Sequence, residues 1–345
     1  MLRRFAWVLL VFGCGGESST LIAVDTPTDA DVSLTSAPPA TVQSLGAPYP
    51  IVLAHGMFGT DRFADVLEYW FRIPGHLEAQ GEVVFVAEVD PLNDSTTRGL
   101  QLSAFVDEVL AETGHDRVVL IGHSQGGLDA RVVASTYPNK VATVVTIATP
   151  HVGNELVDGS LGLLDNRFGA LATDALAAVL GPFVYDRDED LDVLAALNQV
   201  STEGMDAFNR DYPDAAGVDY FSIAGRTDMV GSDHAACAAP AAPAFVSRWD
   251  DEDDPVSLAM RLSEDLADGN PIGSRPNVLP NDGLVTVDSA RHGTFLGCIP
   301  ADHLEQIGQL VGADPGCALI PPRCNDFAYL EFFAQLADWL RSEGY

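Results

Sequence analysis

Ser124 lies in a short motif whose residue types and spacing are typical of a serine nucleophile. The segment VVLIGHSQGG, residues 118–127, places a G-x-S-x-G directly after four apolar residues. A sharp turn between a buried strand and a helix pushes such a serine out above the edge of a sheet, and the flanking glycines relieve the crowding. The helix adds its N-terminal partial positive charge. This position favours a nucleophile over an ordinary turn serine.

A serine hydroxyl attacks only when a base takes its proton, and the base needs a carboxylate that fixes its tautomer. In strand–turn–helix sites the acid and then the histidine follow the serine along the chain. His303, in DHLEQIGQ, lies late in the chain and before a predicted helical segment. It is therefore the predicted base, with His292 as the next choice, whereas His151 is predicted to be structural.

Two aspartates fit the place of the acid. Asp282 opens the tight turn NDG before an apolar run, and Asp228 follows the apolar segment DYFSIAG. Both positions suit a loop at the edge of a sheet, so the local pattern leaves the choice open.

Two backbone N–H groups are predicted to bind the negative charge that develops on an attacked carbonyl oxygen. Gln125 follows the nucleophile, and Met57 follows an early apolar run that stops at His55-Gly56. N–H groups from these two places form the oxyanion hole of strand–turn–helix nucleophile sites. Met57 and Gln125 are therefore expected beside Ser124.

The surrounding elements alternate between strand and helix patterns. Short apolar runs have the pattern of buried strands. They are residues 49–54, 83–89, 117–121, 141–148 and 219–225. Apolar residues at helical spacing predict helices over 95–114, 126–137 and 327–340. The alternation is typical of an α/β protein with a mostly parallel central sheet flanked by helices.

The N-terminal end has the pattern of an export signal. Two arginines precede an apolar run, and Cys14 follows it at the place of the lipidated cysteine of a bacterial lipoprotein. Residues 1–13 are predicted to be a signal peptide, and the protein to be an outer membrane lipoprotein or, with a plain secretory signal, a secreted protein. Residues 14–47 are rich in Ser, Thr, Pro, Ala and Asp, and are predicted to form a flexible linker.

The composition indicates which partners, disulfides and metal sites to expect. The chain has 50 Asp and Glu against 18 Lys and Arg, a formal net charge of −32. Such a charge repels phosphate backbones, so nucleic acid is not an expected partner. Four cysteines remain after Cys14, an even number that predicts two disulfides in an exported protein. No cysteine and histidine spacing indicates zinc.

Several motifs, in order along the chain, resemble those of the secreted bacterial triacylglycerol lipases. They read YPIVLAHGMFGTD, IGHSQGGLDAR, IATPHVGNE, NDGLV and DHLEQIGQ, within residues 48–313. The resemblance implies an α/β-hydrolase domain over 48–345 whose triad is Ser124, Asp282 and His303, because the family's acid lies in the NDG segment. It also implies a lid, inserted at about 152–215, that opens at a lipid surface. Some members of the family need a dedicated folding chaperone.

The resemblance further implies one structural calcium ion beside the predicted base. The family pattern uses a carboxylate, a Gln and a backbone carbonyl after the histidine. Here these are Glu305, Gln309 and Ala313. The segment WDDEDDPVSLAM supplies a second carboxylate, Asp254 first, with Asp253 and Asp251 as alternatives. These hard oxygen donors suit Ca²⁺, although Glu305 replaces the family's usual Asp and has a longer arm.

The cysteines depart from the family pattern. Several members carry a cysteine six residues after the NDG aspartate, where this chain has Asp288. The predicted bridges are therefore Cys237–Cys298 and a local Cys317–Cys324.

The expected function is hydrolysis of the carboxylic esters of acylglycerols through an acyl-enzyme. The nearest alternative is a short-chain carboxylesterase or polyester depolymerase with the same triad. A non-catalytic relative that binds lipid is the alternative from a different class of protein. An apolar lid favours long acyl chains over soluble esters.

Overall fold

The computed structural model of this chain describes residues 44–57, 59, 62–63, 67–154, 157–158, 192–227, 234–249, 279–309 and 327–345. The predicted signal peptide, Cys14 and nearly all of the predicted linker lie outside these residues. Most of the predicted lid also lies outside them, and so do Asp254, Ala313, Cys317 and Cys324. These parts of the sequence analysis stay predictions.

A parallel sheet of six strands forms the centre of the described chain. Its order is β4 (Val84–Ala87), β1 (Ile51–Ala54), β5 (Val118–His123), β6 (Val141–Ile147), β7 (Asp219–Gly225) and β8 (Thr294–Ile299), and each neighbouring pair is parallel. Every residue of β1, β5 and β6 is buried, as expected for parallel strands covered on both faces. The sequence predicted all of these strands except β8.

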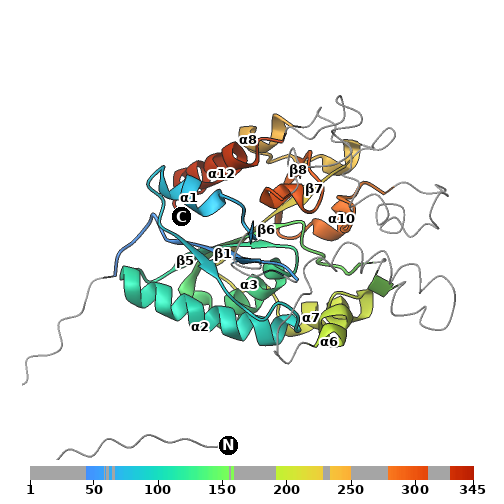
Figure 1. Cartoon of the computed structure of the whole chain (residues 1–345), viewed down its shortest axis with the longest axis horizontal. Helices are drawn as coiled ribbons and strands as arrows, with labels where there is room; N and C mark the ends of the chain where they lie inside the picture. Colours follow the sequence, from blue (N-terminus) through green and yellow to red (C-terminus); the bar gives the residue numbers. More distant parts are fainter. Residues whose placement is uncertain are drawn as a thin grey trace, which may run out of the picture. The chain divides into compact units, whose positions relative to one another are not determined.

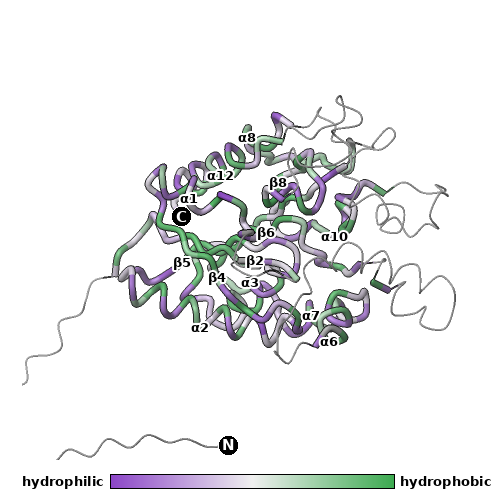
Figure 2. Tube along the Cα trace, in the orientation of Figure 1, coloured by the Kyte–Doolittle hydropathy of each residue, from purple (hydrophilic) through white to green (hydrophobic). Residues whose placement is uncertain are grey.

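Helices cover both faces of the sheet (Figure 1). On one face lie α1 (Ile73–Glu78) and α12 (Tyr329–Glu343), and on the other lie α2 (Ser95–Thr113) and α3 (Gln125–Thr136). Alternate residues of β1 pack toward different faces. Ile51 and Leu53 join the core with α1 and α12, whereas Val52 and Ala54 join the core with α2 and α3. Figure 2 shows the central strands as hydrophobic segments between these more polar helices.

The helix ends follow local sequence signals. Asp94 caps α2, because its side chain accepts hydrogen bonds from the backbone N–H groups of Thr96 and Thr97. Gly114 ends α2 with a φ of 73°, a left-handed conformation that glycine adopts without strain. The helix predicted over 95–114 is therefore confirmed.

The remaining described elements are shorter. They are the antiparallel pair β2 (Arg62–Phe63) and β3 (Leu67–Glu68), the 3-10 turns η1 (Pro138–Lys140), η3 (His234–Cys237) and η4 (Glu305–Ile307), and the helices α6 (Val193–Gln199), α7 (Thr202–Asp211), α8 (Ala244–Ser247) and α10 (Val287–Ala290). Met205 and Phe208 of α7 pack against α3. The predicted Cys237–Cys298 disulfide is present and ties η3 to β8.

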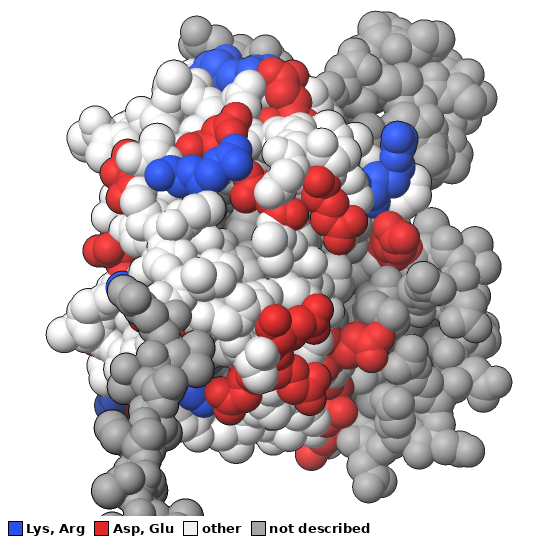
Figure 3. Space-filling model, turned by 90° about the vertical axis from the view of Figure 1, so that its left-hand side faces the viewer, with Lys and Arg blue, Asp and Glu red and all other residues white. Residues whose placement is uncertain are grey.

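The described surface reflects the acidic composition. Figure 3 shows one face of the molecule, on which acidic side chains gather in a patch and basic side chains are fewer. Within the described residues, none of the helices has the length and apolar character needed to cross a membrane.

Candidate active site

Ser124 stands at a strained turn between β5 and α3. Its φ is 55° and its ψ is −130°, a conformation that residues other than glycine rarely adopt. Gly122 and Gly126 make this turn possible. A Cβ at Gly122 would collide with the carbonyl oxygen of Gly126, and a Cβ at Gly126 would collide with that of Ala54. The structure therefore has the strand–turn–helix geometry that the motif predicted.

His303 and Asp282 form a buried pair in loops between β7 and the C-terminal helix. His303 Nδ1 lies 2.8 Å from Asp282 Oδ2, and the backbone N–H of His303 donates to the carbonyl oxygen of Asp282 at 2.9 Å. The other carboxylate oxygen accepts backbone N–H groups from Leu284 at 3.0 Å and Val285 at 2.7 Å. Asp282 is fully buried and His303 is 5% exposed. The carboxylate is thus fixed on both sides, with one oxygen directed at the imidazole.

His292 and His151, the two other histidines considered in the sequence analysis, have different partners. His292 Nε2 bonds to Asp214 Oδ1 at 2.8 Å, and its ring stacks on that of His151. His151 is buried and bonds through its ring to Thr146 and Arg131, as expected of a structural histidine. Asp228, the other candidate for the acid, lies outside the described residues.

One pocket brings the predicted residues together. Ser124, His303, Met57 and Gln125 all line it, and its volume is about 70 Å³. Its remaining walls are mostly apolar. They come from Tyr69, Pro150, Asn154, Val157, Leu197, Val200, Leu284, Val285 and Leu304. The residues predicted as nucleophile, base and oxyanion donors therefore line the same largely apolar pocket.

A buried arginine that the sequence analysis missed holds the loop after β1. Arg98 and Asp129 are both fully buried, and their side chains form an ion pair of 2.8 Å. The guanidinium also donates to the carbonyl oxygens of His55 at 2.7 Å and Gly56 at 3.3 Å. In a trans peptide the C=O and the N–H point in opposite directions. Holding the Gly56 carbonyl therefore sets the direction of the Met57 N–H.

Tyr69 also escaped the sequence analysis, because nothing in its local spacing distinguishes it. Its hydroxyl accepts the N–H of Gly56 at 2.9 Å and lies 2.7 Å from His123 Nδ1. Burial raises the pKa of Tyr69, so its hydroxyl stays protonated and donates a hydrogen bond to His123 Nδ1. The same hydroxyl therefore joins the loop of Met57 to the residue before the nucleophile.

His123, the residue before Ser124, has its imidazole close to that of His303. The rings of His123 and His303 have centroids 4.5 Å apart. Burial, and then the nearby His303, hold the pKa of His123 well below its usual range. His123 therefore stays neutral beside His303.

Two residues of the predicted calcium site, Glu305 and Gln309, lie in the described chain shortly after His303. Glu305 is 2% exposed, and its Oε2 accepts the N–H of Asp302 at 3.1 Å. The side-chain nitrogen of Gln309 donates to the carbonyl oxygens of Glu68 and Tyr69. Within the described residues, no three His, Cys, Asp or Glu side chains group closely enough to hold a metal ion.

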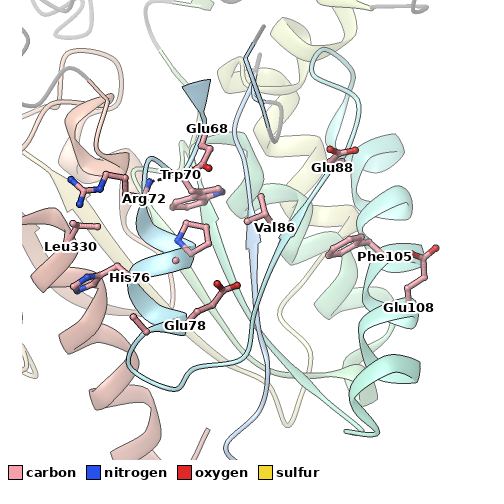
Figure 4. A pocket seen from close by; sticks show the side chains of 13 residues that line it. Glu68, Trp70, Arg72, His76, Glu78, Val86, Glu88, Phe105, Glu108 and Leu330 are labelled. Atoms are coloured by element: carbon pink, nitrogen blue, oxygen red, sulfur yellow. Dashed lines mark hydrogen bonds between the residues drawn. The ribbon is translucent and has the colours of Figure 1, made fainter. Parts of the chain in front are cut away.

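A second, wider hollow of about 1000 Å³ lies along the outer edge of β4 (Figure 4). Trp70 and Val86 lie between walls from α1 and α2, and several glutamates surround them. Its lining, all within the described chain, includes no serine, threonine or cysteine. Charged residues at a free sheet edge also discourage pairing with other strands. The predicted nucleophile and base line the smaller pocket and not this hollow.

Comparisons with known proteins agree with this geometry. Residues 49–228 match the family described as alpha/beta hydrolase fold. A triacylglycerol lipase of Burkholderia plantarii is 33% identical over 90% of this chain and 90% of its own length. One from Vibrio cholerae serotype O1 is 35% identical over 76% of this chain and 81% of its own length.

Solved structures show the same fold. The crystal structure of Staphylococcus hyicus lipase has a TM-score of 0.55 at 19% identity, over 86% of this chain and 96% of that chain. The sequence relatives and the shared fold together show that this chain belongs to the bacterial triacylglycerol lipases, carboxylic ester hydrolases with the α/β-hydrolase fold.

Proposed function

We propose that this chain hydrolyses the carboxylic esters of acylglycerols through an acyl-enzyme on Ser124. The observation that carries the proposal is that Ser124, at its strained turn, shares one pocket with His303, which is bonded to buried Asp282. Ser124 Oγ attacks the ester carbonyl carbon while His303 Nε2 takes its proton. His303 returns that proton to the departing alcohol. Water, activated by the same histidine, then releases the fatty acid.

The N–H groups of Met57 and Gln125 bind the oxyanion in this proposal. Both residues line the pocket, and Gln125 begins α3, whose N-terminus adds partial positive charge. Arg98 supports the assignment, because it fixes the peptide that carries the Met57 N–H. Donors that are already oriented need no reorganisation when the negative charge develops.

The pocket walls support an acyl substrate, and its size supports a cover that moves. The cavity of about 70 Å³ is small, so a long acyl chain needs additional space. Val152 and Leu194 are 57% and 61% exposed. They lie close in sequence to two lining residues, Asn154 and Leu197. Exposed apolar side chains near a small apolar pocket favour contact with a lipid surface.

We expect activity to rise when the substrate passes from solution into emulsion. An apolar cover is stable in water only when closed, and a lipid surface stabilises its open form. The measurement is the initial rate on a triglyceride through its solubility limit, with a soluble p-nitrophenyl ester as the comparison. Leu194→Ser should weaken the rise and leave the rate on the soluble ester unchanged. A hyperbolic response through the solubility limit would favour a short-chain carboxylesterase.

A structural calcium ion beside His303 is part of the same proposal. The carboxylate of Glu305 fits it, because it is buried in η4, directly after the loop that carries the base. The remaining proposed donors are Gln309, Asp254 and Ala313. The ion would stabilise the loop and take no part in the chemical steps.

Removal of calcium should therefore lower the melting temperature and the activity together, and added Ca²⁺ should restore both. The measurement is a melting curve and a rate before and after dialysis against EGTA, with metal content followed by mass spectrometry. Mg²⁺ is the control for readdition, because it prefers a tighter octahedral set of ligands. An unchanged melting curve and rate in metal-free protein would remove the ion from the proposal.

A further inference from the structure

Gln306 contacts the same carboxylate oxygen that faces the base. Its Nε2 lies 2.9 Å from Asp282 Oδ2 and 3.4 Å from the carbonyl oxygen of Ala301. Both neighbours are acceptors, so the end of the amide that faces them is the NH₂ group. Oδ2 of Asp282 therefore accepts two hydrogen bonds, one from His303 and one from Gln306.

The surroundings of Gln306 are built to keep the amide in this place. The residue is fully buried in η4. Gly225, the last residue of β7, provides the space, because a Cβ there would collide with Nε2 of Gln306. The other end of the amide, Oε1, is buried without a hydrogen-bond partner among the described residues.

Gln306 does not reach the substrate. It is absent from the residues that line the pocket of Ser124, whereas His303 and Leu304 are among them. Any effect of Gln306 on the reaction therefore passes through Asp282 and then His303.

We infer that Gln306 is a positioning residue that holds Asp282 Oδ2 against His303 Nδ1 through a neutral N–H donor. This inference rests on the proposed function, in which Asp282 is the acid of the triad. Two backbone N–H groups fix Oδ1, so the amide completes the set of donors around the carboxylate. The amide adds no charge beside the imidazolium that forms on His303 during the reaction. A carboxylate at the same place would add one.

The test compares two variants of nearly the same size. Gln306→Met removes the donor, and we expect kcat to fall about tenfold with KM unchanged, because Gln306 lies outside the pocket. Gln306→Glu places a second carboxyl group beside Asp282. Two carboxyl groups this close share one proton, so the new group can still donate to Oδ2, and kcat should fall less than in Gln306→Met. Rates on a soluble p-nitrophenyl ester are taken per serine labelled by a fluorophosphonate, so unfolded protein does not contribute.

Gln335→Glu is the matched control. Gln335 also donates to a carboxylate, that of Glu331, at 2.9 Å, but on the exposed face of α12. Its variant should keep the wild-type kcat. A wild-type kcat for Gln306→Met, or a raised KM with an unchanged kcat, would overturn the inference.

Asp282→Asn, measured in parallel, separates the two proposals. If it keeps the wild-type rate, the acid of the proposed function is wrong. If it loses activity while both Gln306 variants behave as wild type, only the role of Gln306 is wrong.

Discussion

Replacing Ser124 with alanine is expected to lower the rate of ester hydrolysis by about 10⁶, the typical loss when a triad nucleophile is removed. Alanine keeps the Cβ and removes only the oxygen, so the backbone strain of the turn at φ 55° does not change. His303 then has no hydroxyl to deprotonate. The residual rate would come from the oxyanion donors and substrate binding.

The measurement combines hydrolysis of a p-nitrophenyl ester with labelling by a fluorophosphonate. Wild-type protein should be labelled once, and Ser124→Ala should not be labelled. Ser342→Ala is the matched control, because Ser342 is an exposed serine near the end of α12. Circular dichroism checks that both variants fold. Labelling that persists in Ser124→Ala would show that another residue is the nucleophile.

Replacing Asp282 with asparagine is expected to lower turnover by about 10⁴, because it favours the wrong imidazole tautomer. The hydrogen bonds around the carboxylate give the reason. The backbone N–H groups of Leu284 and Val285 require an acceptor at Oδ1, so the asparagine oxygen must stay there. Its NH₂ group then faces His303, whose Nδ1 has to accept. The proton of the imidazole moves to Nε2, which can no longer take the proton of Ser124.

The chain offers a close control for this substitution. Asp214 also bonds to a histidine, His292, at 2.8 Å, but outside the pocket of Ser124. Asp214→Asn should therefore leave kcat close to wild type. Asp228→Asn is also expected to have little effect. If Asp228→Asn abolished turnover and Asp282→Asn did not, the acid would follow strand β7 instead.

The parts of the site that the sequence predicted depend on short-range patterns. The turn at Ser124 follows from a strand, two glycines and a helix within ten residues, and the structure confirms it. Asp282 and Asp228 have similar local patterns, so the residues alone left both open. The order of family motifs, rather than a local feature, favoured Asp282.

Two residues near the site, Arg98 and Tyr69, were not predicted, because their roles depend on contacts between distant segments. Arg98 resembles any polar residue of an amphipathic helix, and its burial is explained by distant partners such as Asp129, 31 residues away, and the His55 carbonyl, 43 residues away. The hydroxyl of Tyr69 meets Gly56 and His123, which are 13 and 54 residues away. Strand β8 was missed because Gly297 interrupts its apolar run, which leaves no clear strand pattern. A single sequence carries no local signal for such pairs.

The glycines around the nucleophile limit how this enzyme can be changed by laboratory evolution. A methyl group at Gly126 would meet the backbone of β1, and one at Gly127 would meet the side chain of Thr149. Random libraries that include these positions would consist largely of misfolded protein. Leu197 and Leu284 line the same pocket from segments outside the turn. Substitutions at these two leucines are expected to alter the preference for acyl chains and to retain the geometry at Ser124.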